Sequence, residues 1–185
     1  MDKDQDTPLG VAVKGLIAGM AGALAVTGMV ATGRKVMSDQ DAGSGGQIDE
    51  GITAGQALSE GPGMPPNMNR VTATFVQKVA TGIFGTSLGS RQQYIAGTAW
   101  HLAYGGFWGL VYALVQSSTQ VSRFLVGPIH GFVVWAIGPG SLVPRMKLML
   151  PPTKQRPRLV AMVIAVHVVY GSLVALIFHL LRHRD

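Results

Sequence analysis

The chain has 185 residues, the size of one domain, and carries a formal net charge of +6 with only 13% charged residues. This low charge and a positive mean hydropathy indicate a chain solvated mainly by lipid. Nucleic-acid binding is not favoured, because aromatic and basic residues do not alternate. The absence of Cys excludes disulfides, thiolate metal sites, iron–sulfur clusters and covalently attached haem.

Four apolar segments follow a polar N-terminal tail, residues 1–10. Each is close to the roughly 20 residues that a helix needs to cross a bilayer. The tail is acidic and lacks the positive region of a signal peptide, so we expect the first segment to be retained. The sequence therefore predicts an all-α membrane protein with four transmembrane helices. The predicted spans are 11–31, 94–115, 124–143 and 159–181.

The connection between the first two spans has two parts. Residues 38–66 are rich in Gly, Asp, Gln and Pro and show no apolar period, which predicts a flexible loop. Over residues 71–84, apolar side chains recur at helical spacing with polar ones opposite, which predicts a short amphipathic helix. Such a helix lies in the membrane interface or caps the bundle. A movable gate is the alternative.

The third span contains Gly138-Pro139-Gly140. Proline removes a backbone hydrogen bond, so the helix either kinks and continues to Val143 or gives way to non-helical backbone shielded by the other helices. We favour the kink.

Short motifs recur in the same order in the two halves of the chain. They are Gly-x-Ile-x-Gly at 15–19 and 127–131, Pro-Pro at 65–66 and 151–152, and His-x-x-Tyr-Gly at 101–105 and 167–171. These matches indicate a duplicated two-helix hairpin. Two spans per repeat give parallel repeats with a pseudo-twofold axis along the membrane normal. His101 and His167 would then lie at the same depth.

Small residues spaced four apart lie inside the predicted spans. In lipid, such spacing lets two helix backbones approach closely, so we assign these positions to helix packing. They are Gly15, Gly19, Gly105, Gly109, Gly127, Gly131 and Gly171.

Three histidines, His101, His130 and His167, are the candidate functional residues inside the spans. In one interpretation, each bonds a carbonyl or a Tyr hydroxyl on a neighbouring helix and fixes the packing. In a second, His101 and His167 are axial ligands of a b-type haem. In a third, the histidines with Tyr104 and Tyr170 form a path for protons or a solute. A zinc site is less favoured, because no carboxylate orients the imidazoles.

These features together resemble the YagU-like family of uncharacterised bacterial inner-membrane proteins. The resemblance rests on the Gly-rich first span, the Pro-Pro loop before an amphipathic helix, and His-x-x-Tyr-Gly in the second and last spans. It extends from about Gly15 to Leu181. It implies a small multi-span membrane protein of a bacterial cytoplasmic membrane and assigns no catalytic residue.

No catalytic set is visible, so we expect a non-enzymatic structural or accessory subunit that contacts lipid and associates with other membrane subunits or with itself. We expect no cofactor. The alternative is a protein that binds b-type haem, or conducts protons or a small solute, through its intramembrane histidines. Lys and Arg are more frequent in the long loop and the loop before the last span, which predicts that both termini lie outside.

Overall fold

The computed structural model describes residues 7–43 and 68–183, and all regular structure in these ranges is helical. The helices are α1 (Pro8–Gly43), α2 (Met68–Phe84), α3 (Ser90–Ser118), α4 (Arg123–Ile137), the π-helix η1 (Gly138–Leu142), α5 (Val143–Arg145), the 3-10 helix η2 (Pro152–Lys154) and α6 (Pro157–Arg182).

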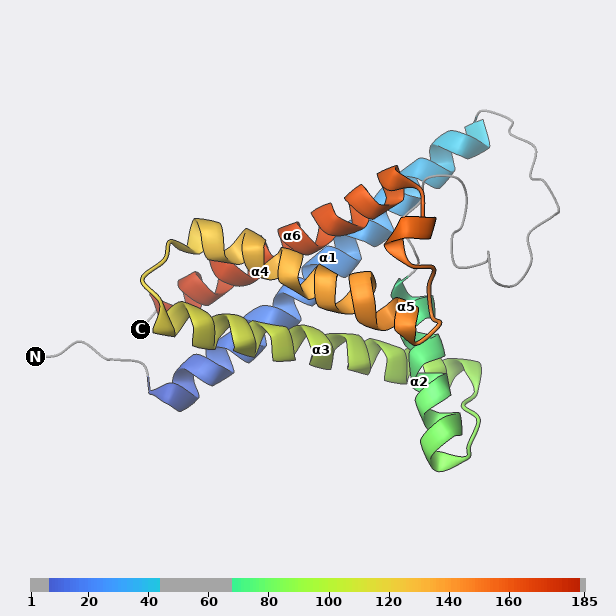
Figure 1. The fold of residues 1–185 in the computed structure, drawn as a ribbon, viewed down its shortest axis with the longest axis horizontal. Coiled ribbons are helices and arrows are strands. Elements are labelled where there is room, and N and C mark those ends of the chain that lie inside the picture. Colours follow the sequence, from blue (N-terminus) through green and yellow to red (C-terminus); the bar gives the residue numbers. More distant parts are fainter. Residues whose placement is uncertain (1–6, 44–67, 184–185) are drawn as a thin grey trace, which may run out of the picture.

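Four long helices run side by side along the longest axis of the molecule (Figure 1). Helix α1 packs against α3 and α6, and α4 packs against α6. Helix α2 packs against the first part of α3 and projects from one end of the bundle. The start of α1 and the end of α6 lie together at the other end. The bundle therefore has two distinct ends, and α2 covers only one of them.

Three helical segments are long and apolar enough to cross a membrane: Pro8–Thr32, Arg123–Arg145 and Pro157–Arg182. They contain three of the four predicted spans. Helix α3 contains the fourth, residues 94–115, and at 29 residues it has sufficient length. It is less apolar than the other three, because Gly, Gln, His and Tyr occupy much of it. Its membrane crossing therefore remains a prediction.

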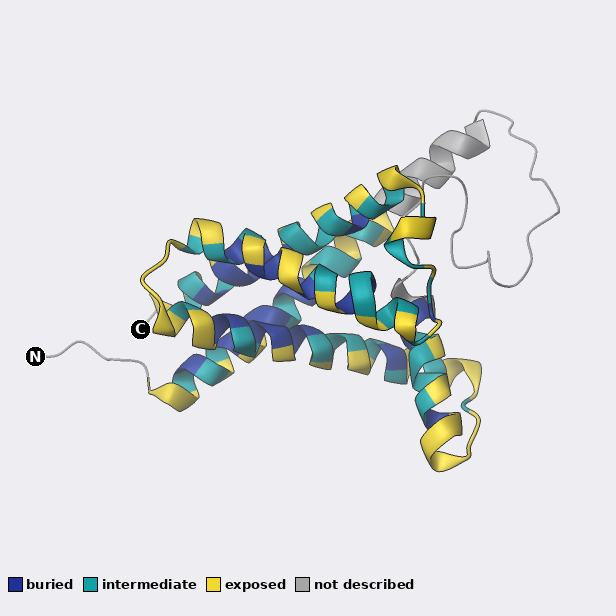
Figure 2. Cartoon of the chain, in the orientation of Figure 1, coloured by how far each residue is buried: buried dark blue, intermediate teal, exposed yellow. Residues whose placement is uncertain are grey.

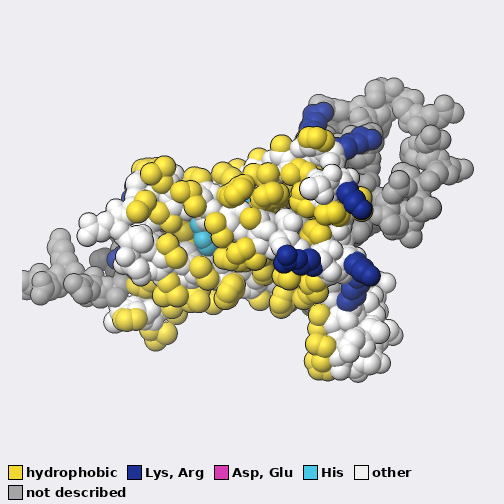
Figure 3. Space-filling view, in the orientation of Figure 1, with side chains coloured by type: hydrophobic (Ala, Val, Ile, Leu, Met, Phe, Trp, Pro, Cys, Tyr) yellow, Lys and Arg dark blue, Asp and Glu magenta, His cyan; other side chains and the backbone are white. Residues whose placement is uncertain are grey.

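The surface of the bundle has the polarity expected of a protein in lipid. Large apolar side chains point outward on every long helix, as Leu24, Phe107, Ile129 and Leu176 do. The faces of the helices that are turned to the interior are buried (Figure 2), and many of the positions there hold small residues. In the space-filling view, hydrophobic side chains cover the middle of the bundle, and many of the basic side chains lie toward the end that carries α2 (Figure 3). Burial of small residues beneath exposed large ones is typical of helices that associate in lipid.

The amphipathic helix predicted over 71–84 is present as part of α2. It ends at Gly85, whose φ of 63° allows Thr86 N to donate to Ala80 O at 3.2 Å. The loop predicted from residue 38 begins later, because α1 continues to Gly43. The rest of that prediction, residues 44–66, lies outside the described residues.

The third predicted span stays helical through its proline. At η1 the helix widens by one residue per turn, and Val143 N donates to Gly138 O. Pro139 has no N–H to donate, and a π-turn accommodates the lost bond without breaking the helix. The chain thus continues helically to Arg145, as the favoured prediction required, and η1 places Pro139 against the interior of the bundle.

Candidate functional site

Two contacts between small residues fix the positions of the long helices. In the first, Gly15 and Gly19 of α1 meet Gly105 and Gly109 of α3; a β-carbon added to Gly19 would lie 2.7 Å from Gly109 Cα. This distance is too short for any side chain, so the helices touch through their backbones.

The second contact joins α4 to α6. Gly127 and Gly131 meet Gly171 and Ala175, and a β-carbon added to Gly171 would lie 2.7 Å from Gly131 Cα. The structure thus places all seven glycines assigned to packing at contacts between helices. The two tight pairs, α1 with α3 and α4 with α6, leave space between them toward the end that carries α2.

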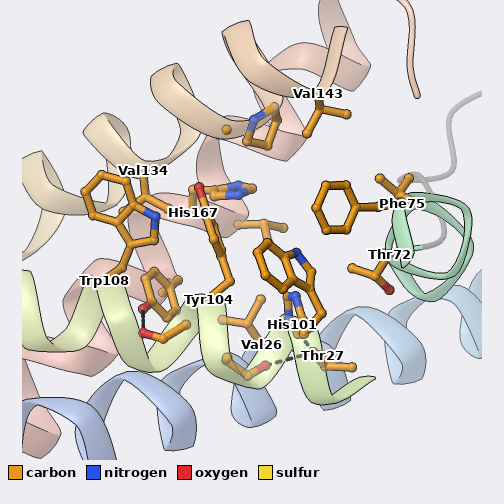
Figure 4. A pocket seen from close by; sticks show the side chains of 18 of the residues that line it. Val26, Thr27, Thr72, Phe75, His101, Tyr104, Trp108, Val134, Val143 and His167 are labelled. Carbon is orange, nitrogen blue, oxygen red and sulfur yellow. Dashed lines mark hydrogen bonds between the residues drawn. The ribbon is translucent and has the colours of Figure 1, made fainter. Parts of the chain in front are cut away.

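That space is a cavity of about 540 Å³ lined by residues of α1, α2, α3, α4, η1, α5, the segment that follows α5, and α6. Its volume falls within the usual range for sites that hold small molecules. Its wall is mostly apolar, and none of the described residues that line it is charged. Figure 4 shows His101 and His167 among the side chains that line it, together with Tyr104, Trp108 and Phe75. The cavity is therefore suited to an uncharged molecule.

His101 is held by a hydroxyl on the neighbouring helix α1. Its Nε2 lies 3.2 Å from Thr27 Oγ1, and this hydroxyl lies 2.8 Å from Ala23 O. The Thr27 proton is donated to the Ala23 carbonyl, so the His101 Nε2–H must be the donor to Thr27. In this neutral tautomer the other nitrogen, Nδ1, carries a lone pair.

His167 reaches the same wall from α6 but bonds its own helix. Its Nδ1 lies 2.7 Å from Val163 O, which can only accept, so Nδ1 carries the proton. His167 Nε2 makes no hydrogen bond with any of the described residues. We expected each histidine to bond a carbonyl or a Tyr hydroxyl on a neighbouring helix. His101 does bond the neighbouring helix, but through a Thr hydroxyl, whereas His167 bonds a carbonyl of its own helix.

His130 is buried away from the cavity. Its ring meets the rings of Trp108 and Tyr112 edge to face, with centroids 5.7 Å and 5.4 Å apart. Its Nε2 has no hydrogen-bond partner among the described residues. The structure thus brings together two of the three candidate histidines and separates the third, which packs as an aromatic side chain.

The two tyrosines of the repeated motif also line the cavity, but they differ in bonding. Tyr170 donates its hydroxyl to Gly105 O at 2.7 Å, which joins α6 to α3. The Tyr104 hydroxyl is buried beside Gly138 and has no partner among the described residues. Only one tyrosine therefore ties the two helix pairs together.

The sequence did not single out Thr27, Phe75 or Lys78. Phe75 of α2 stacks on Trp100 with ring centroids 4.7 Å apart, and Lys78 Nζ donates to Met146 O at 3.0 Å. These contacts fasten α2 over the cavity. The sequence could have indicated Thr27, because it places a hydroxyl inside a predicted span. It could not have indicated the contacts of Phe75 and Lys78, because these depend on how the helices are arranged.

A b-type haem fits this site poorly. His167 has the arrangement expected of a ligand, with Nδ1–H bonded to a carbonyl and Nε2 free. His101, however, turns its Nε2 to Thr27. The two haem propionates would also find no cation among the described residues of the cavity wall. Among the described side chains, residues 7–32 and 71–183, no group of three or more metal-binding side chains occurs.

Comparisons with models of known families, with curated proteins and with solved structures found no match to this chain. The resemblance to the YagU-like family therefore remains a prediction from the quoted motifs.

Proposed function

We propose that this chain is a non-enzymatic integral membrane protein that binds an uncharged, largely apolar molecule bearing a hydroxyl or N–H group. The observation that carries the proposal is the pairing of two imidazole lone pairs, on His101 and His167, with an apolar cavity whose described lining includes no Lys, Arg, Asp or Glu. An unmatched polar nitrogen in such surroundings costs on the order of 1–3 kcal/mol. A ligand that donates a proton to it offsets that cost.

The proposal places α1, α3, α4 and α6 across a bacterial cytoplasmic membrane as two repeated hairpins, with both termini outside. Four crossings agree with the shared position of the start of α1 and the end of α6 (Figure 1). The cavity then lies within the bilayer, because its histidines are about the middle of α3 and α6. Ligands of this class partition into lipid and would reach the cavity from there.

The test compares two ligands that differ only in the donor, geraniol and its methyl ether. Both are titrated into the purified protein in detergent, with tryptophan fluorescence as the readout, since Trp100 and Trp108 line the cavity. We expect the alcohol to bind about tenfold more tightly than the ether, the effect of one additional hydrogen bond of about 1.4 kcal/mol.

The variant His167→Phe removes one of the two acceptors with little change in volume, so it should reduce the preference for the alcohol. His130→Phe is the matched control, because His130 does not line the cavity. Equal binding of alcohol and ether by the wild-type protein would contradict the proposal, as would an unchanged preference in His167→Phe.

A second candidate function, that of an accessory subunit, is favoured by the exposed tip of α2. Ile83 and Phe84 are 72% and 73% exposed at the end of the helix that projects from the bundle. A partner subunit, a second copy of this chain or the membrane interface would cover them. Light scattering of Phe84→Ser and wild-type protein in the same detergent tests self-association, and equal masses would exclude a dimer through this tip.

A further inference from the structure

A second cavity, of about 330 Å³, lies at the end of the bundle away from α2. It is enclosed by the last turns of α3 and α6 and the first turn of α4. Four basic or imidazole side chains line it: Arg123, His179, Arg182 and His183. None of them lines the larger cavity, so the two sites are separate.

The cluster is ordered by contacts among its own members. Arg123 Nη1 donates to His179 Nδ1 at 3.1 Å. The rings of His179 and His183 have centroids 3.9 Å apart, and His183 Nδ1 donates to His179 O at 2.9 Å. The Arg182 guanidinium lies over the Phe178 ring, 5.8 Å from its centroid. Side chains from two helices are thus held around one pocket.

Arg123 has no carboxylate to pair with among the described side chains, residues 7–32 and 71–183, because these ranges contain no Asp or Glu. Arg123 also occupies the first turn of α4, where the helix dipole is already positive. The Arg123 guanidinium and this positive helix end therefore both attract an anion.

We infer that this pocket binds a phosphate group, with the phosphodiester of an anionic lipid headgroup as its source. Arginine pairs with phosphate through two parallel N–H bonds, which makes the chemistry specific. Arg123 and Arg182 are the end residues of two segments that are long and apolar enough to cross a membrane. Their side chains therefore lie at the boundary of lipid and water, where headgroup phosphates are found.

The experiment titrates the purified full chain, in a neutral detergent, with short-chain phosphatidylglycerol, short-chain phosphatidylcholine and inorganic phosphate. Binding is measured by native mass spectrometry and by the shift of the thermal unfolding midpoint. We expect phosphatidylglycerol to bind more tightly than phosphatidylcholine, and Arg123→Gln to weaken its binding about tenfold, the usual effect of losing a charge-assisted hydrogen bond.

Arg182→Gln provides a second variant should Arg123→Gln unfold, and Arg91→Gln is the control, because it removes the same charge from an exposed site on α3. Wild-type binding of inorganic phosphate that is lost in Arg123→Gln would support a phosphate site filled from solution. The inference is overturned if phosphatidylglycerol and phosphate bind all folded variants equally, or if Arg91→Gln weakens binding as much as the pocket variants do.

Discussion

The α1–α3 pair and the α4–α6 pair are built alike but present different chemistry to the cavity between them. Both pairs meet through small residues spaced four apart. Twelve residues after the first glycine of each motif stands Thr27 in one pair and Pro139 in the other. Thr27 leaves α1 regular and bonds His101, whereas Pro139 lies in a π-turn and gives His167 no hydroxyl.

This difference shows that the contacts between the helices and the polar groups of the cavity wall are set by separate positions. The glycines determine how closely the two helices of a pair approach, and both pairs have glycines at equivalent positions. The residue about two turns past the second glycine of each motif determines whether the neighbouring helix offers the histidine a hydroxyl. Single residues outside the contacts between the helices therefore give the cavity two unlike walls.

The largest effect should follow from filling a backbone contact. Gly19→Leu and Gly171→Leu each place a side chain where the facing helix backbone lies, so both should destabilise the protein by about 3 kcal/mol or more. Gly28→Leu is the control, because a β-carbon there meets nothing within 4 Å. Thermal unfolding in detergent measures all three. A large loss of stability for only one of the two variants would show that the two pairs are not held together in the same way.

The two tyrosines should respond oppositely to removal of the hydroxyl. Tyr170→Phe loses the bond to Gly105 O and should destabilise the bundle by about 1 kcal/mol. Tyr104→Phe removes a buried hydroxyl that has no partner among the described residues, so it should be neutral or stabilising. The same unfolding measurement compares them, and equal losses would show that both hydroxyls are bonded.

A smaller effect is expected at Thr27. Thr27→Val keeps the shape but removes the acceptor for His101 Nε2, which should cost about 0.5–1 kcal/mol. Thr27→Ser retains the hydroxyl and should behave more like the wild type. If valine and serine give the same stability, the bond to His101 does not contribute.

The smallest effect concerns the tie between α2 and the segment that follows α5. Lys78 Nζ donates to Met146 O, and both residues lie at the end covered by α2. Lys78→Met should leave the bundle intact but speed hydrogen exchange in α2, because one of its fastenings is lost. Lys154→Met is the control for loss of charge. Unchanged hydrogen exchange in α2 would mean that the packing of Phe75 on Trp100 is sufficient to hold α2 on the bundle.

The sequence predicted the parts of this molecule that depend on local pattern. Apolar length gave three of the membrane-length helices, helical spacing gave α2, and the four-residue spacing of glycines identified the contacts. The repeated His-x-x-Tyr-Gly motif also led to the cavity, since His101 and His167 both line it.

The remaining features depend on geometry that pattern does not contain. His167 bonds the Val163 carbonyl of its own helix. This choice of partner depends on the side-chain rotamer of His167, which the residue type does not specify. The contribution of Thr27 required knowing which face of α1 meets α3. The continuation of α1 to Gly43 was missed because the polar composition there suggested a loop, although several of its residues are adequate helix formers.

The central claim, that lipid solvates a bundle of four membrane-crossing helices, is tested most directly on α3, the least apolar of the four. The chain has no Cys, so Phe107→Cys provides a single site for a spin label halfway along α3, where the native side chain is 54% exposed. In reconstituted vesicles, the label should collide readily with oxygen, which dissolves in lipid, and rarely with a water-soluble nickel complex. Ready collision with nickel would place α3 in water and contradict the account.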